Sequence, residues 1–257
     1  MLIILSPAKK LLSFTKPYPG LTTDPLLKDE MTELAKLMKS KSAEQIGKLM
    51  NLSKNLACLN YERYQVFNLE KAPLASSYPA LELFQGDVYQ GLSAKSWTDE
   101  DKHYAQKHLC ILSGLYGILR PLDRIQPYRL EMGVRLANPK GETLYDYWGQ
   151  SLTKMLNQQL ALNSNPMLIN LASREYFKVL DQKNLSFPVL TIHFIEQKNN
   201  KAKIIGIHAK KARGLMAKFL IQKRVENLGK IKEFCDLGYR YCEETSSEML
   251  MNFIRVH

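Results

Sequence analysis

Most of the side chains that could do chemistry follow the ends of four apolar segments of the chain. Small residues and then polar or charged ones occupy residues 6–10, 113–117, 172–176 and 209–214. Ligands of α/β sheets bind in the crevice at the carboxyl ends of the strands. If the four segments are strands of one sheet that point the same way, their polar ends meet in one cleft; as separate loops they would each face solvent. Four similar ends favour the shared cleft.

The charged side chains of this cleft suit phosphate groups and nucleobases. Lysine and arginine pair with phosphate, and arginine and tyrosine stack on bases. The cations that we expect to bind phosphate are Lys9, Lys10, Arg120, Arg129, Lys210, Lys211 and Arg213. The other polar side chains expected in the cleft are Asp87, Tyr128, Glu131, Ser173, Glu175 and Tyr176. The carboxylates could act as acid or base, but orienting the surrounding cations is their commoner role.

The segment from residue 108 to residue 136 is expected to form the central wall of the cleft. Prolines fix its path, and Gly114 and Gly117 let the chain turn into the wall. The side chains that carry this interpretation are Arg120, Tyr128, Arg129 and Glu131.

The chain carries none of the common catalytic or metal-binding motifs. Walker A, Gly-x-Gly-x-x-Gly, His-Glu-x-x-His and Gly-x-Ser-x-Gly are all absent. Of the five histidines only His208 lies near one of the four segment ends, so a Ser-His-Asp set cannot be argued. The four cysteines are dispersed, without a Cys-x-x-Cys. We therefore expect no metal and no cofactor, and catalytic residues stay unassigned.

Charge is distributed unevenly along the 257 residues. The net charge is +11, and residues 198–240 alone hold twelve Lys or Arg against three Asp or Glu. A clustered positive field attracts a polyanion and releases its counterions. The alternative is a surface that only keeps the protein in solution. The sequence also predicts a cytosolic protein without a membrane contact. Its cysteines are dispersed, its apolar runs are too short to cross a bilayer, and its first segment resembles a core strand rather than a signal peptide.

Hydrophobic patterning predicts a mixed α/β sheet surrounded by helices. A composition of 45% hydrophobic residues allows one domain, from residue 1 to residue 257, with a large core. Thr143 begins an amphipathic helix that runs to residue 160. The predicted buried strands cover residues 2–5, 110–112, 166–171 and 189–195, and a hairpin through residues 198–201 leads to another over residues 203–208.

Residues 42–64 are predicted to form a helical hairpin. Ser42 begins a capping box, and the second helix starts after Asn51-Leu52-Ser53. The pattern resembles the helix-hairpin-helix DNA-binding motif, in which Gly-hydrophobic-Gly forms the turn and an alanine follows at the position of Ala57. Neither glycine is present, but asparagine tolerates a left-handed φ and serine can cap a helix. Asn51, Ser53 and Lys54 are therefore candidate phosphate ligands; a plain hairpin in the core is the alternative.

Several distinctive motifs follow one another along the chain. They include Ser6-Pro7-Ala8-Lys9, Phe84-Gln85-Gly86-Asp87-Val88-Tyr89, Leu112-Ser113-Gly114-Leu115-Tyr116-Gly117, Gln126-Pro127-Tyr128-Arg129-Leu130-Glu131-Met132-Gly133 and Lys210-Lys211-Ala212-Arg213-Gly214. Together they resemble the motifs of the bacterial YaaA family, in the same order and over essentially the whole chain. The resemblance implies a cytosolic peroxide stress protein that binds DNA and helps to keep free iron low. It also implies a single-domain α/β fold with a positively charged cleft and a helix-hairpin-helix element.

Three hypotheses follow from these observations. The leading one is a peroxide stress protein that binds double-stranded or locally opened DNA with weak sequence preference. The rival is an enzyme that acts on a small phosphorylated or nucleotide substrate in the cleft. The third, a plain iron store, predicts iron in the purified protein, and we expect none.

Overall fold

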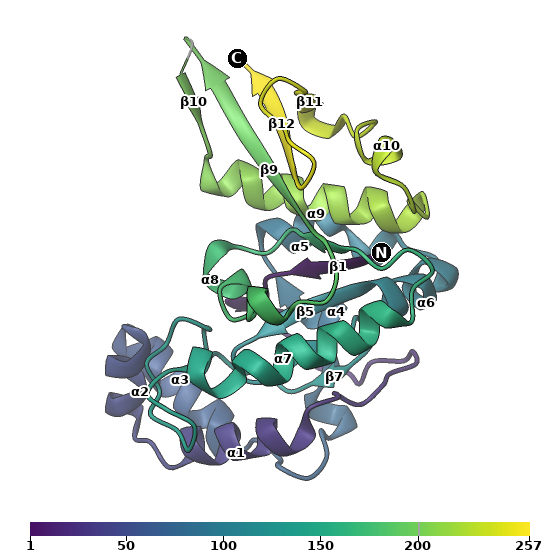
Figure 1. Ribbon diagram of the computed structural model, residues 1–257. Helices are drawn as coiled ribbons and strands as arrows, with labels where there is room; N and C mark the ends of the chain where they lie inside the picture. The colour runs from purple at the N-terminus through teal and green to yellow at the C-terminus, as the bar shows by residue number, and fades with distance from the viewer. Residues whose placement is uncertain (200) are drawn as a thin grey trace.

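The computed structural model describes residues 1–199 and 201–257. In that part of the chain the central sheet has eight strands, ordered β11-β12-β9-β8-β1-β5-β6 with β10 paired to β9 (Figure 1). Five neighbouring strands run parallel: β12 (Leu250–Val256), β9 (Val189–Lys198), β8 (Leu168–Asn170), β1 (Leu2–Leu5) and β5 (Leu109–Ser113). The strands added antiparallel are β6 (Gly117–Leu119), β10 (Lys201–Lys203) and β11 (Arg240–Tyr241).

Smaller elements pair outside this sheet. β2 (Lys10–Leu11) pairs with β4 (Phe84–Gln85), and β3 (Tyr78–Pro79) pairs with β7 (Arg124–Ile125). The helices are α1 (Lys28–Lys39), α2 (Ala43–Met50), α3 (Lys54–Gln65), α4 (Ala80–Leu83), α5 (Asp87–Leu92), α6 (Asp99–His108), α7 (Leu144–Ala161), α8 (Arg174–Phe177), α9 (Gly206–Gln222) and α10 (Leu228–Ile231). Short 3-10 turns cover Leu74–Ser76, Ala94–Ser96, Gln182–Asn184 and Asp236–Gly238.

The apolar strands at the centre are buried because helices cover both faces of a parallel sheet. All four residues of β1 are buried, between β5 on one side and β8 on the other. β9 alternates buried and partly exposed side chains, with Leu190, Ile192 and Phe194 inward. One hydrophobic core extends from Met1 to Phe253, as expected for the predicted mixed α/β sheet. Among the described residues, none of the helices is both long and apolar enough to cross a membrane.

Capping residues set the predicted helix starts. Ser42 and Thr143 each accept a hydrogen bond from the backbone N–H three residues later, and each closes a capping box. α7 is fixed to the end of β5 by Trp148, whose indole N–H donates to the Gly114 carbonyl at 2.9 Å. α1, α2 and α3 gather at one end of the molecule, while β9 to β12 form the other end (Figure 1).

The predicted strand over residues 203–208 is wrong. β10 ends at Lys203, and α9 begins at Gly206. Isoleucines at 204, 205 and 207 favour a strand locally, but the following sequence buries Ala209, Ala212 and Met216 at helical spacing. Packing of that face therefore stabilises a helix from Gly206 onward instead of a strand. Residues 209–214 are two turns of α9 rather than the end of a strand; Asn200, in the predicted turn, lies outside the described residues.

α9 packs against α5 at backbone contact. A Cβ atom on Gly214 would lie 1.8 Å from the Val88 carbonyl oxygen, and one on Gly91 would lie 2.2 Å from the Lys211 carbonyl oxygen. Only glycine permits this approach. The close crossing brings the first half of α9 to the carboxyl ends of β1 and β8, where α5 also begins.

Candidate functional site

A pocket of about 290 Å³ lies at the carboxyl ends of β1 and β8. We call it the central pocket. Its lining comes from residues 6–10 after β1, 85–89 at the start of α5, and 128–131, together with Leu171, Ser173, Glu175, Tyr176, Lys210 and Arg213. Segments far apart in the sequence thus contribute to one concave surface. Lys210 and Arg213, which were expected to follow a fourth strand, come from α9 instead.

Most of the residues singled out by sequence line this pocket. They are Lys9, Lys10, Asp87, Tyr128, Arg129, Glu131, Ser173, Glu175, Tyr176, Lys210 and Arg213. Arg120, Lys211 and the three hairpin residues Asn51, Ser53 and Lys54 are not part of the lining. Sequence reasoning missed Ser6 and Tyr89 as individual side chains, although both stand in segments that it had marked.

Ser6 and Tyr89 join the two central strand ends. The Ser173 backbone N–H donates to the Ser6 hydroxyl oxygen at 2.8 Å, and that hydroxyl donates to the Ser173 hydroxyl at 3.2 Å. The Tyr89 hydroxyl donates to the Ser6 carbonyl at 3.1 Å, and burial raises the pKa of Tyr89 well above its usual value. These groups therefore fix the floor of the pocket in neutral, hydrogen-bonded form.

Glu131 organises two of the cations. Its Oε1 atom accepts from Arg129 at 2.9 and 3.2 Å and lies 3.1 Å from Lys9 Nζ. Burial opposes ionisation, but Arg129 and Lys9 outweigh it and hold the pKa of Glu131 below its usual value. Glu131 is thus an ionised partner that orients and partly neutralises Lys9 and Arg129.

Gly114 makes the wall of the pocket possible. A Cβ atom at this position would lie 2.3 Å from the Leu130 carbonyl oxygen, so a side chain would push the wall away from the end of β5. Tyr128 is held in the wall by a hydrogen bond of 2.6 Å between its hydroxyl and that of Ser113. Glu175 accepts from the Gly133 backbone N–H at 3.0 Å. The central wall consists of residues 128–131, and residues 113–117 support it from behind.

Three cations of the lining are without a carboxylate. The side chains of Lys10, Lys210 and Arg213 form no ion pair or hydrogen bond within residues 1–199 and 201–257. The two lysines are exposed, whereas Arg213 is only partly exposed. Burial lowers the pKa of the Arg213 guanidinium. Asp87 also makes no hydrogen bond or ion pair with the described chain.

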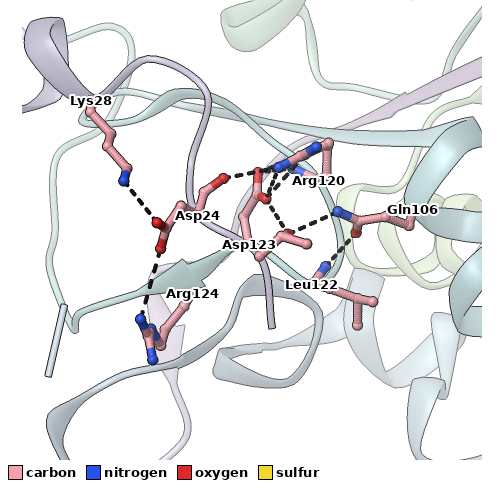
Figure 2. Close-up of polar contacts among 8 residues, drawn as sticks. Asp24, Lys28, Gln106, Arg120, Leu122, Asp123 and Arg124 are labelled. Atoms are coloured by element: carbon pink, nitrogen blue, oxygen red, sulfur yellow. Dashed lines mark hydrogen bonds and ion pairs between the residues drawn. The ribbon is translucent and has the colours of Figure 1, made fainter. Parts of the chain in front are cut away.

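Arg120 has a different environment, away from the pocket. Its guanidinium donates to Asp123 at 2.8 Å and to the Asp24 carbonyl at 2.9 Å (Figure 2). Asp123 is fully buried and also accepts from the Thr23 hydroxyl at 2.6 Å. Arg120 therefore connects two loops, and its charge is matched within the protein.

The predicted helical hairpin is present as α2 and α3. Asn51 adopts the left-handed conformation at the turn, with φ 50° and ψ 56°. Ser53 is the N-cap residue of α3 by backbone conformation, but its side chain makes no capping hydrogen bond. A Cβ atom on Gly47 would lie 3.2 Å from that of Ala57, so the two helices cross closely there. Lys54 is exposed in the first turn of α3, which has no acidic residue.

The hairpin is tied to the central pocket. The hydroxyl of Tyr64, near the end of α3, donates to the Arg129 carbonyl at 3.0 Å. Tyr64 is fully buried, and burial raises its pKa well above its usual value. The end of α3 is thus attached to the wall of the pocket.

No cluster of three or more His, Cys, Asp or Glu side chains that could hold a metal ion occurs in the described part of the chain. The residues of the pocket can bind anions and accept or donate hydrogen bonds. Their chemistry is that of lysine, arginine, carboxylate, serine and tyrosine groups.

Comparison with known proteins gives a consistent result. The family model described as peroxide stress protein YaaA matches residues 1–245. A UPF0246 protein of Legionella pneumophila (strain Lens) is 63% identical over 257 residues and covers all of both chains. UPF0246 proteins of Phenylobacterium zucineum and Caulobacter vibrioides are 43% and 46% identical; they cover 99% and 94% of this chain, and the alignments span 95% and 93% of those proteins.

Proposed function

Because the chain belongs to the YaaA family of peroxide stress proteins, we propose that it acts in the peroxide stress response by binding DNA in the cytosol. The DNA is double-stranded or locally opened, and sequence preference is weak. In this proposal the protein also helps to limit free iron, which protects DNA and proteins from oxidative damage. Family membership supports the stress role, and the hairpin supports the DNA role.

The single observation that carries DNA binding is the open start of α3. The first backbone N–H groups of a helix have no partner within the helix, and the helix dipole makes that end attractive to anions. Here no Ser53 side chain and no first-turn carboxylate satisfies them, and Lys54 stands beside them. The left-handed Asn51 replaces the glycine that such a turn commonly uses. These features suit a DNA phosphate.

Cations near the hairpin supply a second contact region in this proposal. The central pocket has five cations, Lys9, Lys10, Arg129, Lys210 and Arg213, against the three acids Asp87, Glu131 and Glu175. Lys211 is exposed on α9 next to them. In this proposal one DNA molecule contacts both the start of α3 and the pocket; Tyr64 attaches the other end of α3 to the pocket wall.

The salt dependence of duplex binding tests the proposal. Log affinity should fall with log salt by about 0.9 for each phosphate contacted, and Lys54→Glu should lower affinity for unrelated sequences alike. Lys154→Glu is the matched control, because it makes the same charge change at an exposed position of α7 outside both regions. If both variants lose the same affinity for DNA, the loss in Lys54→Glu reflects only the change in net charge, and the hairpin does not bind DNA.

A second candidate is an enzyme that acts on a small phosphorylated or nucleotide substrate. The observation in its favour is the central pocket itself, which is small and concave, unlike a surface that only follows a DNA backbone. Turnover of a phosphorylated compound by the purified chain, lost in Arg129→Ala, would support this candidate. Binding without turnover would contradict it, and DNA binding would be the remaining candidate function.

A further inference from the structure

Arg213 is a partly buried cation without a carboxylate partner in the described residues. It lies on α9 between Ala212 and Gly214, and the contact of Gly214 with Val88 holds that turn of the helix against α5. Its guanidinium forms no ion pair or hydrogen bond with the described residues, and burial lowers its pKa. Removing a charge from water without a partner costs free energy. Such a cost is expected where a ligand supplies the missing anion.

Lys210 extends the cationic side of the pocket. It stands three residues before Arg213, so both side chains lie on one face of α9, and both line the pocket. Arginine binds phosphate through two parallel N–H groups, and lysine adds a point charge. Two unpaired cations on one wall suit a phosphate monoester.

Other polar side chains of the lining offer hydrogen-bond acceptors. The Asp87 side chain has no partner in the described chain, and the Oε2 atom of Glu131 makes no hydrogen bond. The Oε1 atom of Glu175 accepts only from the Gly133 backbone N–H. Lys9 and Arg129 are already occupied by Glu131. The ligand should therefore carry N–H or O–H donors in addition to its phosphate.

Apolar and aromatic groups make up much of the remaining lining. They are Pro7, Ala8, Val88, Tyr89, Tyr128, Leu130, Leu171 and Tyr176. Such surfaces favour a flat nucleobase, whereas inorganic phosphate or a sugar phosphate would leave them unfilled. A volume of about 290 Å³ is at the small end for an enclosed ligand site, which suits one nucleotide and excludes a base pair.

We propose that the central pocket binds one nucleoside monophosphate unit, with its phosphate at Arg213 and Lys210 and its base among the apolar side chains. This proposal deepens the proposed function and rests on it: the unit is a free nucleotide or an unpaired nucleotide of a DNA strand. The shared chemistry is the same in both cases, and the experiment separates the two sources.

Isothermal titration of the full chain tests the site. Nucleoside 5′-monophosphates should bind at least about tenfold more tightly than inorganic phosphate or ribose 5-phosphate, and Arg213→Gln should weaken nucleotide binding by about tenfold or more. Arg213→Lys keeps the charge, loses the paired N–H groups and should be intermediate. Lys218→Gln, on the same helix but outside the lining and not among the expected phosphate ligands, should change affinity less than about twofold. Unchanged nucleotide affinity in Arg213→Gln, or equal affinity for phosphate and nucleotides, overturns the proposal.

An oligonucleotide with one unpaired 2-aminopurine separates the two sources. If the pocket takes a nucleotide of a strand, its fluorescence changes on binding, a fully paired control does not change, and free nucleotide competes. If the ligand is a free nucleotide, titration shows binding and the fluorescence of the oligonucleotide stays constant. Both outcomes support the pocket.

Failure of the pocket is distinguishable from failure of the DNA-binding function. Duplex binding that depends on Lys54, together with no nucleotide binding and no fluorescence change, overturns the pocket alone. Nucleotide binding that depends on Arg213, in a chain that fails to bind duplex at low salt, supports the pocket and contradicts the DNA-binding function. A thermal melt of Arg213→Gln at or above that of the unmodified chain excludes misfolding as the cause of lost binding.

Discussion

Arg120 and Arg213 are two partly buried arginines with opposite surroundings. The guanidinium of Arg120 is matched by Asp123 at 2.8 Å and by the Asp24 carbonyl at 2.9 Å (Figure 2). That of Arg213 has no such partner within residues 1–199 and 201–257, although it lies in a pocket. An arginine whose charge is matched inside the protein stabilises the fold, whereas an unmatched one is available to a ligand.

Glu196 is a buried carboxylate whose charge, like that of Arg120, is matched within the protein. It is buried on β9, and its carboxylate accepts from Arg255 at 2.9 and 3.1 Å and from the Tyr239 hydroxyl. His257 adds a fourth contact. This cluster and the pair of Arg120 with Asp123 are structural. They contrast with Arg213 in the central pocket, whose side chain has no carboxylate partner within residues 1–199 and 201–257.

Asp123→Asn is expected to have the largest effect on stability. It removes the carboxylate charge opposite Arg120 at a site that solvent does not reach, and breaking a buried pair costs about 3–5 kcal/mol. Urea unfolding should show this loss in the free energy of unfolding. Duplex and nucleotide binding, measured on the folded fraction, should remain unchanged because neither residue lines the pocket.

Glu44→Gln is the matched control. Glu44 pairs with Lys48 at 2.7 Å, but both side chains are 77% exposed, so the loss should be far smaller than that of Asp123→Asn. Similar losses for the two variants would contradict the distinction between buried structural pairs and surface pairs.

Acid should reveal the contribution of Glu196. Burial opposes its ionisation, but hydrogen bonds from Tyr239, His257 and Arg255 outweigh it and lower the pKa from 4.5 to about 2. A lowered pKa stabilises the folded state above pH 4.5, and this contribution, of about 3 kcal/mol, is lost as the pH falls toward 2. Unfolding of the parent and of Glu196→Gln at several pH values measures it. The difference between them should shrink in acid; a difference independent of pH would contradict the assignment.

Local patterns in the sequence predicted much of the fold. The uninterrupted apolar run at residues 2–5 is β1, and Ser42 and Thr143 begin helices because a side-chain oxygen and a residue three positions later suffice to close a capping box. The failure at residues 203–208 has the opposite cause. Strand propensity of the isoleucines was overridden by packing of α9 against α5, which no local window contains.

The candidate site was predictable by segment but not by side chain. Strand ends and charged motifs marked the segments that line the pocket, whereas the partner of each charge depends on tertiary structure. Asp123 lies three residues after Arg120 in the sequence, but only the structure shows that it binds Arg120 and that the Arg213 side chain has no carboxylate partner among the described residues. Gly114 was expected to serve a turn, yet its role is to admit the Leu130 backbone from another part of the chain.

Asn51→Ala should have a smaller effect than either buried pair. Alanine in a left-handed conformation costs about 1 kcal/mol, whereas Asn51→Gly should be neutral or slightly stabilising. Urea unfolding gives the stabilities, and duplex titration shows whether the turn still presents the start of α3. Unimpaired stability in Asn51→Ala would mean that the turn is not held in its left-handed form.

Arg213→Gln should change stability least and in the opposite direction. Without ligand the variant loses an unmatched, desolvated charge, so its free energy of unfolding should rise by about 0.5 kcal/mol, as is common where function costs stability. Inorganic phosphate should reduce this difference, because an anion that binds the folded parent stabilises it by mass action and leaves the variant unaffected. Urea unfolding with and without phosphate measures both parts. If Arg213→Gln is less stable than the parent, and phosphate does not stabilise the parent, then Arg213 is a structural residue like Arg120. That result would contradict the distinction between the two arginines.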